Sequence, residues 1–201
     1  MVAIELVNQS LFLQLNASAD PPASTVMIAK LCADTLIFLV PLTLVCGWLR
    51  ATSIRRRLLL EAAVAGLLAL GLNQLIGLVW SHPRPFMIGL GHTLIPHVAD
   101  SSFPSDHVTL LSAVAVTFLI RRRWLKAGLG LALLVLPVAW ARIYLGVHFP
   151  LDMLGAILVA GTAASIAFLS GEWYLNKLLV LALTAYRWLF APLIRRGWLL
   201  A

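Results

Sequence analysis

The chain has 201 residues, of which 61% are hydrophobic and 11% charged, and its mean hydropathy is +0.95. Soluble domains are nearer half apolar and one quarter charged, so this composition excludes a soluble globular protein and predicts an integral membrane protein. The formal net charge is +7, but the basic residues cluster in short loops between apolar runs, a pattern that sets membrane topology and argues against nucleic-acid binding.

The apolar runs, taken in chain order, predict an all-α transmembrane bundle of five to six spans. Residues 1–16 are mildly amphipathic and a break follows at Asp20-Pro21-Pro22, so the N-terminal segment 1–25 is interpreted as an interfacial segment, with a re-entrant helix as the alternative. Five spans follow in a core at 26–170, and their ranges are 26–49, 58–80, 107–121, 125–141 and 151–170. Residues 172–201 form a hydrophobic C-terminal segment, for which a sixth span and an interfacial helix are both open. The whole chain, 1–201, is predicted to be one membrane-embedded domain.

The loops between these spans divide by charge. Alternation of five helices places the basic segments 50–57 and 121–126 on one side, and the loops 81–106 and 143–150 on the other. Because Lys and Arg favour the cytoplasmic side, the second pair of loops is expected to face outward. In a bacterium this is the periplasmic face of the inner membrane.

The most informative outward-facing stretch is 141–152. Arg142 offers a planar guanidinium that suits phosphate oxygens, and His148 is a nucleophile or acid–base group near neutral pH. Pro150 predicts a helix start, so Asp152 falls in the first turn, where its carboxylate reaches back to His148 and fixes its tautomer. A cation, a nucleophile and an orienting carboxylate predict phosphoryl chemistry, although the His–Asp pair alone equally suits a structural contact.

Two further clusters fall on the same face. Arg84 lies between two prolines that hold its guanidinium at the end of the second span, with an interfacial snorkelling arginine as the alternative. Ser105 comes just before the third span, where a hydroxyl and free amides form an anion site or simply cap the helix. His107, at the same helix start, is a candidate acid for a leaving oxygen.

Three short motifs together resemble the type 2 phosphatidic acid phosphatase superfamily, over residues 77–152. They are Arg84-Pro85, then Pro104-Ser105-Asp106-His107, then Arg142 with five residues to His148 and three more to Asp152. The resemblance implies that His148 forms a phosphohistidine, that Asp152 orients it and that His107 protonates the leaving group. It also implies that no metal or other cofactor takes part. The phosphate-binding residues that we expect on this basis are Arg84, Ser105, Asp106, Arg142 and Lys30.

Three positions depart from the family pattern. Gly77 occupies the place of the family lysine, and Lys30 is the candidate substitute because an intramembrane lysine by default suggests function, although pairing with Asp34 is an equally fair explanation. Ala141 stands where the family has serine. Asp106 replaces the family glycine, and in this it is similar to the short bacterial isoprenoid-diphosphate phosphatases of the bacitracin-resistance type.

This resemblance predicts a phosphatase that converts undecaprenyl diphosphate to undecaprenyl phosphate and so recycles the cell-wall lipid carrier. The expected partners are a polyprenyl diphosphate lipid and the bilayer, with no nucleic acid and an oligomeric state left open. The alternatives are a phosphatase of phosphatidylglycerol phosphate or phosphatidic acid, a transporter lined by Lys30, Asp34 and Glu61, and a lipid-binding relative without activity.

The remaining polar residues give weaker signals. The loop residues His82, His92, His97 and Asp100 have spacings that match no recognised metal-ligand pattern, and His82 is the one that we expect to be nearest to substrate. Three polar residues inside the second span are expected to face the bundle interior and to need partners there; they are Glu61, Asn73 and Gln74.

Overall fold

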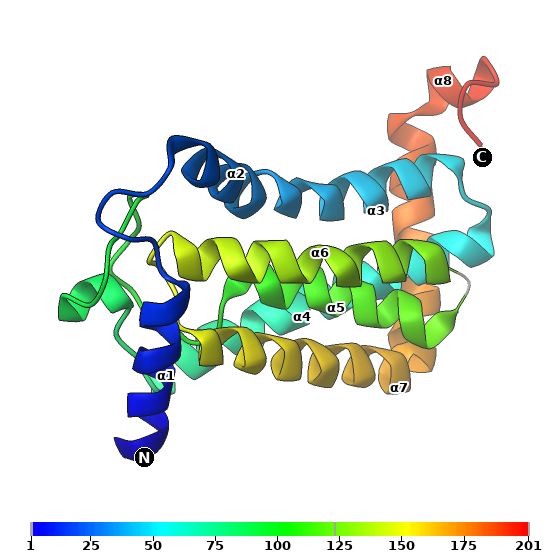
Figure 1. Ribbon diagram of the computed structural model, residues 1–201. Helices are drawn as coiled ribbons and strands as arrows, with labels where there is room; N and C mark the ends of the chain where they lie inside the picture. Colours follow the sequence, from blue (N-terminus) through cyan, green and yellow to red (C-terminus); the bar gives the residue numbers. More distant parts are fainter. Residues whose placement is uncertain (1, 123, 201) are drawn as a thin grey trace.

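The computed structural model describes residues 2–122 and 124–200, and every regular element in that part of the chain is a helix (Figure 1). Arg123, one of the basic residues behind the predicted orientation, lies outside the described residues. The bundle is made of α2 (Ala23–Asp34) with α3 (Leu39–Arg50), α4 (Ser53–Val79), α5 (Asp106–Arg121), α6 (Leu125–Tyr144) and α7 (Pro150–Leu189). A short turn, η1 (Leu36–Phe38), joins α2 to α3. The predicted all-α membrane bundle is confirmed.

The predicted spans differ in length. Among the described residues, four helical units are long and apolar enough to cross a bilayer, namely 23–50, α4, α6 and α7. α5 has only 16 residues, about 24 Å at ~1.5 Å per residue, which is less than a hydrocarbon core of ~30 Å. It packs against α4, α6 and α7, and most of its side chains from Val108 to Phe118 are buried. The third predicted span is therefore a short central helix enclosed by the others.

Small side chains bring α7 close to α4 and α5. In lipid, helices associate through close packing, which small residues permit. The buried alanines at these contacts are Ala65, Ala69, Ala113, Ala160, Ala163, Ala164 and Ala167. Because the helices are held this closely, the first turn of α7 lies beside the first turn of α5, where the motif residues gather.

The C-terminal segment differs from the expected division at residue 170. α7 continues as a single helix of 40 residues. Figure 1 shows that it bends, so that its second half crosses the end of the bundle that carries the basic loops and leads to α8 (Ala191–Arg195). Tyr186 packs edge-on against Trp48 with ring centroids 6.2 Å apart, and Arg56 donates a 2.7 Å hydrogen bond to the carbonyl of Leu200. These contacts favour the interfacial alternative over a sixth span.

Glu61, one of the polar residues expected to need a partner, has one. Its side chain is fully buried in α4 and accepts hydrogen bonds of 3.0 to 3.2 Å from Arg121 at the end of α5. The Arg121 guanidinium also stacks on Phe168 of α7, 4.3 Å from the ring centroid. A buried ion pair thus joins three helices near the basic end of the bundle.

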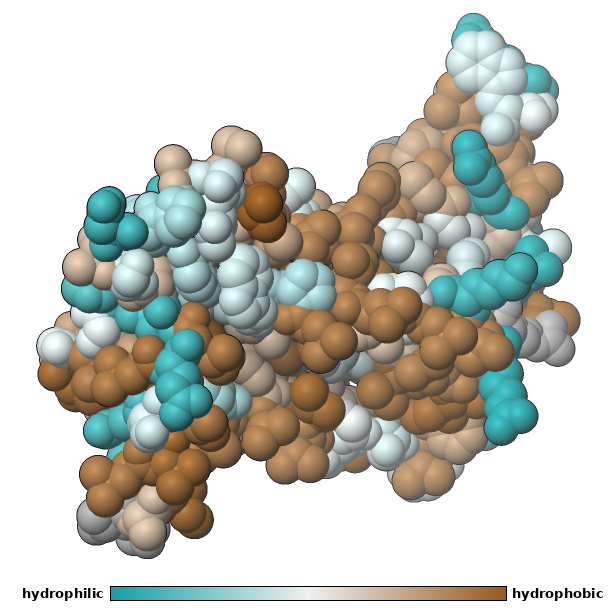
Figure 2. Space-filling model, viewed as in Figure 1, coloured by the Kyte–Doolittle hydropathy of each residue, from teal (hydrophilic) through white to brown (hydrophobic). Residues whose placement is uncertain are grey.

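At the opposite end, α1 (Val2–Leu15) crosses the helix ends, as expected for an interfacial segment (Figure 1). Asn8 accepts a 3.0 Å hydrogen bond from the amide of Leu151, and Phe12 is buried with its ring 5.3 Å from that of Phe149. Figure 2 shows that the outward surface of α1, at the lower left, is largely hydrophobic. α1 therefore packs directly on the segment that carries His148.

Candidate active site

A polar cavity of about 380 Å³ opens at the end of the bundle beside α1, between the last turn of α4 and the first turn of α5. Side chains far apart in the sequence share its wall. The predicted site residues that line it are Arg84, Asp106, His107, Arg142 and His148, and the unpredicted ones include Asn73, Gln74 and His97. Asp152 and Ser105 are buried in the same region, outside this lining.

His148 is carried by the short turn between α6 and α7. Gly146 in this turn has φ of +83°, and a Cβ there would overlap the carbonyl of His92, so the turn requires glycine. The Nε2 atom of His148 lies 3.1 Å from a guanidinium nitrogen of Arg84. Because a guanidinium only donates, Nε2 accepts, and the imidazole proton lies on Nδ1. The Nε2 lone pair is thus held at the cavity.

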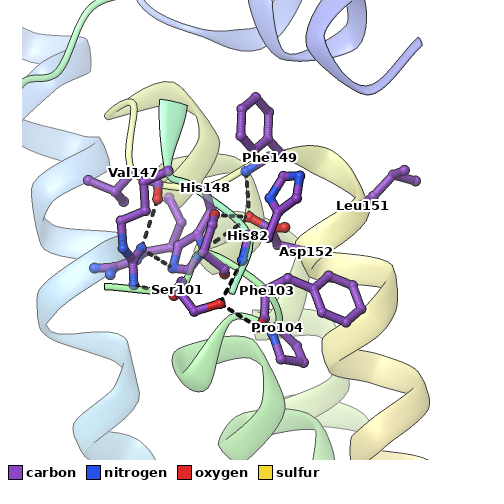
Figure 3. A network of polar contacts seen from close by, with 12 residues as sticks. His82, Ser101, Phe103, Pro104, Val147, His148, Phe149, Leu151 and Asp152 are labelled. Carbon is purple, nitrogen blue, oxygen red and sulfur yellow. Dashed lines mark hydrogen bonds and ion pairs between the residues drawn. The ribbon is translucent and has the colours of Figure 1, made fainter. Parts of the chain in front are cut away.

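The Nδ1 side of His148 is held by two residues, Ser102 and Asp152 (Figure 3). Nδ1 lies 2.9 Å from the carbonyl oxygen of Ser102 and 3.2 Å from the carboxylate of Asp152, which sits in the first turn of α7 as the sequence predicted. The same carboxylate oxygen accepts the Phe149 amide at 2.7 Å and a short hydrogen bond from the Ser102 hydroxyl. This network fixes the ring in one orientation and one tautomer.

Burial lowers the pKa of His148 to about 4, although Asp152 acts in the opposite direction. The imidazole is therefore neutral, and its Nε2 is a competent nucleophile, throughout the physiological pH range. An unfolded histidine takes up its proton near pH 6.5, before the folded one does. Protonation of the unfolded chain therefore removes stability as the pH falls from about 6.5 towards about 4.

This pKa can be measured directly. In histidine-labelled protein in detergent micelles, we expect the NMR signal of His148, assigned with His148→Gln, to titrate near pH 4. A short histidine-containing peptide in the same micelles serves as the control, because an unperturbed imidazole titrates near about 6.5. A His148 signal that titrates together with that of the peptide would contradict the burial argument.

Arg84 is fixed by several acceptors at once. Its Nε donates to Asp100 at 2.8 Å, and its terminal nitrogens donate to the carbonyls of Val147 at 2.8 Å and Ser101 at 3.2 Å. The side chain is 5% exposed. The guanidinium is therefore immobilised next to His148 Nε2, where a phosphate oxygen would meet it, and a snorkelling role does not describe this buried position.

Arg142 is the second guanidinium of the cavity and has an unexpected partner in His97. Its Nη2 donates to His97 Nε2 at 2.8 Å, and the rings of His97 and His148 are 6.2 Å apart. Burial, assisted by the charges of Arg84 and Arg142, lowers the pKa of His97, which keeps this imidazole neutral and able to accept. His97 thus positions Arg142 from the loop above the cavity.

Two buried donors in this region lack partners. Within the described part of the chain, the Nε of Arg142 and the hydroxyl of Ser105 make no hydrogen bond. Ser105 occupies the N-cap position of α5, but its side chain does not cap the helix. Unsatisfied buried donors are unfavourable, and an anion in the cavity would satisfy them.

Asp106, the residue in place of the family glycine, is held by α4. Asn73 donates to it at 2.8 Å and Gln74 at 3.4 Å, and Asn73 also donates to Thr109 at 3.0 Å. Asn73 is buried and has partners, as expected, whereas Gln74 is exposed and does not face the bundle interior. Gly77, one turn further along α4, lies against Ser101 and adds no charge to the wall.

Lys30 is not brought to this cavity. It is exposed on α2 and lines a separate surface depression that it shares with Asp34. The other loop histidines also separate from one another. His82 lies 3.3 Å from Glu5 of α1, and the backbone amide of His92 donates to Asn16 at 2.7 Å. His97 lines the polar cavity, and His82 does not.

Ser102 was not among the predicted site residues, yet its hydroxyl contacts Asp152 and its carbonyl contacts His148. We expect Ser102→Ala to lower kcat roughly tenfold to a hundredfold with little change in KM, because a hydrogen bond to a buried carboxylate is lost. The measurement is steady-state phosphate release, with Ser112→Ala in α5 as a matched serine control. An unchanged kcat would show that the Asp152 carboxylate does not depend on this hydroxyl.

Comparison with known proteins places the chain in a family. The model of the PAP2 superfamily matches residues 58–176, which include all of the motif residues from Arg84 to Asp152. The chain belongs to the PAP2 superfamily. As a PAP2 protein it is a membrane phosphatase, and the enzyme class predicted from the three motifs is confirmed.

Relatives of this PAP2 protein agree in length as well as in sequence. The putative undecaprenyl-diphosphatase YbjG of Escherichia coli is 37% identical over 195 residues, which cover 97% of this chain and 98% of the relative. The undecaprenyl-diphosphatase BcrC of Bacillus subtilis is 43% identical over 119 residues, covering 59% of this chain and 61% of BcrC.

Solved structures share the fold of this PAP2 protein. LpxE of Aquifex aeolicus superposes with a TM-score of 0.62 at 24% identity, over 81% of this chain and 94% of LpxE. A PAP2-type phosphatidylglycerolphosphate phosphatase of Bacillus subtilis gives a TM-score of 0.58 at 21% identity, over 87% of this chain and 89% of that protein. At these identities the likeness concerns the fold.

Proposed function

We propose that this PAP2 phosphatase hydrolyses undecaprenyl diphosphate to undecaprenyl phosphate and inorganic phosphate. The observation that carries the proposal is the Nε2 lone pair of His148, held at a cavity that also contains the guanidinium groups of Arg84 and Arg142. The names of the relatives YbjG and BcrC support the choice of lipid. Asp106, which departs from the general motif, points to the same subgroup.

The first chemical step is attack of His148 Nε2 on the terminal phosphorus. A nitrogen–phosphorus bond forms, the bridging oxygen–phosphorus bond breaks, and the positive charge on the imidazole is stabilised by Asp152 through Nδ1–H. Arg84, Arg142 and the Ser105 hydroxyl bind the phosphoryl oxygens, whose charge is greatest in the transition state. The leaving group is the lipid monophosphate.

The second step returns the enzyme to its starting state. His107 lies in the cavity wall with His148. Because a phosphate monoester has a second pKa near 6, the lipid monophosphate leaves readily as an anion, and the acid role expected of His107 is not required in the first step. In the second step the neutral His107 takes a proton from water, the water oxygen bonds to phosphorus, and the nitrogen–phosphorus bond to His148 breaks. The proton then passes from His107 to the released phosphate, which returns both histidines to their starting state.

The charge distribution supports an outward-facing site in a bacterial inner membrane. The cavity lies at the end of the bundle opposite the basic loop residues Arg55 and Arg122, and Lys and Arg favour the cytoplasmic side. We propose that residues 1–201 form one domain, with α1 at the outer surface and the second half of α7 at the inner surface. Lys30 has no part in this mechanism.

The transport alternative lacks structural support. Lys30 and Asp34 line a surface depression on α2, whereas Glu61 is buried against Arg121 towards the other end of the bundle. The three residues therefore do not share a path through the described part of the chain.

The test compares three lipids with purified protein in detergent and EDTA. We expect phosphate release from undecaprenyl diphosphate to exceed release from phosphatidylglycerol phosphate and phosphatidic acid by at least tenfold in kcat/KM. A higher kcat/KM for either glycerolipid would identify that lipid as the substrate in place of undecaprenyl diphosphate. Absence of release from all three, with undecaprenyl diphosphate still bound in equilibrium dialysis, would favour the lipid-binding alternative.

A further inference from the structure

A second cavity lies directly beside the polar one, under α1. Its volume is about 720 Å³, within the range of about 300–1,000 Å³ typical of small-ligand sites. Its lining includes Ile4 and Leu6 of α1, Ile88 of the short helix η2 (Pro85–Ile88) and Leu151 of α7. The lining is almost entirely apolar, which suits a hydrocarbon and not a phosphate.

Aromatic rings shape this apolar cavity. Trp80, at the end of α4, lies 5.1 Å from Phe103 and 5.8 Å from His82, measured between ring centroids. His82 in turn stands edge-on to Phe149 at 5.5 Å. Such ring faces and edges make favourable contacts with the methyl and vinyl groups of an unsaturated chain.

Polar contacts fix the position of α1 above the apolar cavity. Glu5 lies 3.3 Å from His82 Nε2, and Asn8 accepts the amide of Leu151 at 3.0 Å. These contacts fix α1 over the helix ends. α1 therefore covers the apolar cavity without filling it.

The two cavities meet at Phe103. This residue lines both of them, and Figure 3 shows its ring directed towards Leu151 and away from His148. Gly155 of α7 makes room for the ring, since a Cβ there would overlap it. Leu78 lines the polar cavity and Trp80, two residues on, lines the apolar one. A chain attached to a phosphate beside His148 can thus pass along Leu78 and Phe103 into the space under α1.

We propose that the apolar cavity under α1 binds the first isoprene units of the polyprenyl chain while the diphosphate occupies the polar cavity. This inference rests on the proposed function and adds a role for α1, which becomes part of the substrate site. Each buried methylene strengthens binding about fourfold, so several isoprene units in this cavity produce a large preference for long chains.

Chain-length preference provides the test. Wild-type protein should hydrolyse farnesyl diphosphate, with three isoprene units, at least tenfold better in kcat/KM than dimethylallyl diphosphate, with one. Ile4→Trp and Ile88→Trp fill the cavity and should each reduce this preference at least fivefold, through loss of the longer substrate only. Val7→Trp is the matched control, because Val7 is 57% exposed on α1 and does not line the cavity.

Two results would overturn the proposal: a chain-length preference that both cavity variants leave unchanged, or an equal loss on both substrates.

A photolabelling experiment tests the chain site without requiring turnover, using a farnesyl diphosphate analogue that carries a diazirine on the chain. It should label residues 4–9 and 80–88, and excess phosphatidylglycerol should not compete. Labelling of other residues would contradict the proposal. If phosphatidylglycerol displaced the analogue and abolished the labelling, the cavity would instead be a site for bilayer lipid. If neither diphosphate is hydrolysed but labelling occurs as expected, the proposed reaction fails and the chain site stands.

Discussion

Replacing His148 with alanine should reduce phosphate release from undecaprenyl diphosphate to the uncatalysed background, a loss of about 10⁴-fold or more. The expectation follows from the position of Nε2 at the cavity, since neither Arg84 nor Arg142 can act as a nucleophile. The measurement is phosphate release by detergent-solubilised protein in EDTA. With a radiolabelled terminal phosphate, the wild type should also carry an acid-labile label that the variant lacks.

His92→Ala is the matched control. The His92 side chain is exposed in the loop on the same face, and activity should stay within about twofold of wild type, as for a surface substitution away from the site. Substantial turnover by His148→Ala would contradict the mechanism. If the label persisted in that variant but disappeared in His107→Ala, the nucleophile would be His107.

Replacing Arg121 with alanine should lower the free energy of unfolding by about 3 kcal/mol, because the fully buried Glu61 carboxylate then loses its ion-pair partner. For a chain of this size that corresponds to a fall in Tm of about 6–12 °C. Thermal unfolding in detergent, followed by tryptophan fluorescence, provides the measurement. Lys126→Ala, at an exposed position in the same region, should leave Tm nearly unchanged.

The double variant Glu61→Leu/Arg121→Leu separates charge burial from general disruption. Removing both partners leaves no buried charge, so its Tm should return most of the way to that of wild type. A double variant as unstable as Arg121→Ala would mean that the pair is important for packing, including the stacking on Phe168, rather than for charge compensation.

Local signals in the sequence account for much of the site. Pro150 marks a helix start, and the spacing of His148 and Asp152 then leads to the observed 3.2 Å contact without further information. Arg84 and Arg142 were predicted from their motifs to bind phosphate; the structure brings both to the cavity, and phosphate binding stays a prediction. The placement of these residues could be predicted because it depends on a few neighbouring residues and on general helix geometry.

The features that were not predicted depend on contacts between distant segments. Ser102 reaches Asp152 across 50 positions and His97 reaches Arg142 across 45, and a polar loop gives no sign of which side chain turns inward. Lys30 was chosen for its depth along the first span, but helix rotation, which places it on the outer surface, is set by packing. The bend of α7 was likewise missed because its apolar sequence suits a second span equally well.

The bend of α7 has a consequence for the lipid environment. α7 has 40 residues, so the half before the bend is about 30 Å long at ~1.5 Å per residue, which matches a hydrocarbon core of ~30 Å. In the proposed orientation the half beyond the bend lies on the inner membrane surface, so the height of His148 relative to the outer headgroups depends on hydrophobic matching. In vesicles of increasing acyl-chain length the pocket should sink below the headgroup layer, and turnover should pass through an optimum of bilayer thickness.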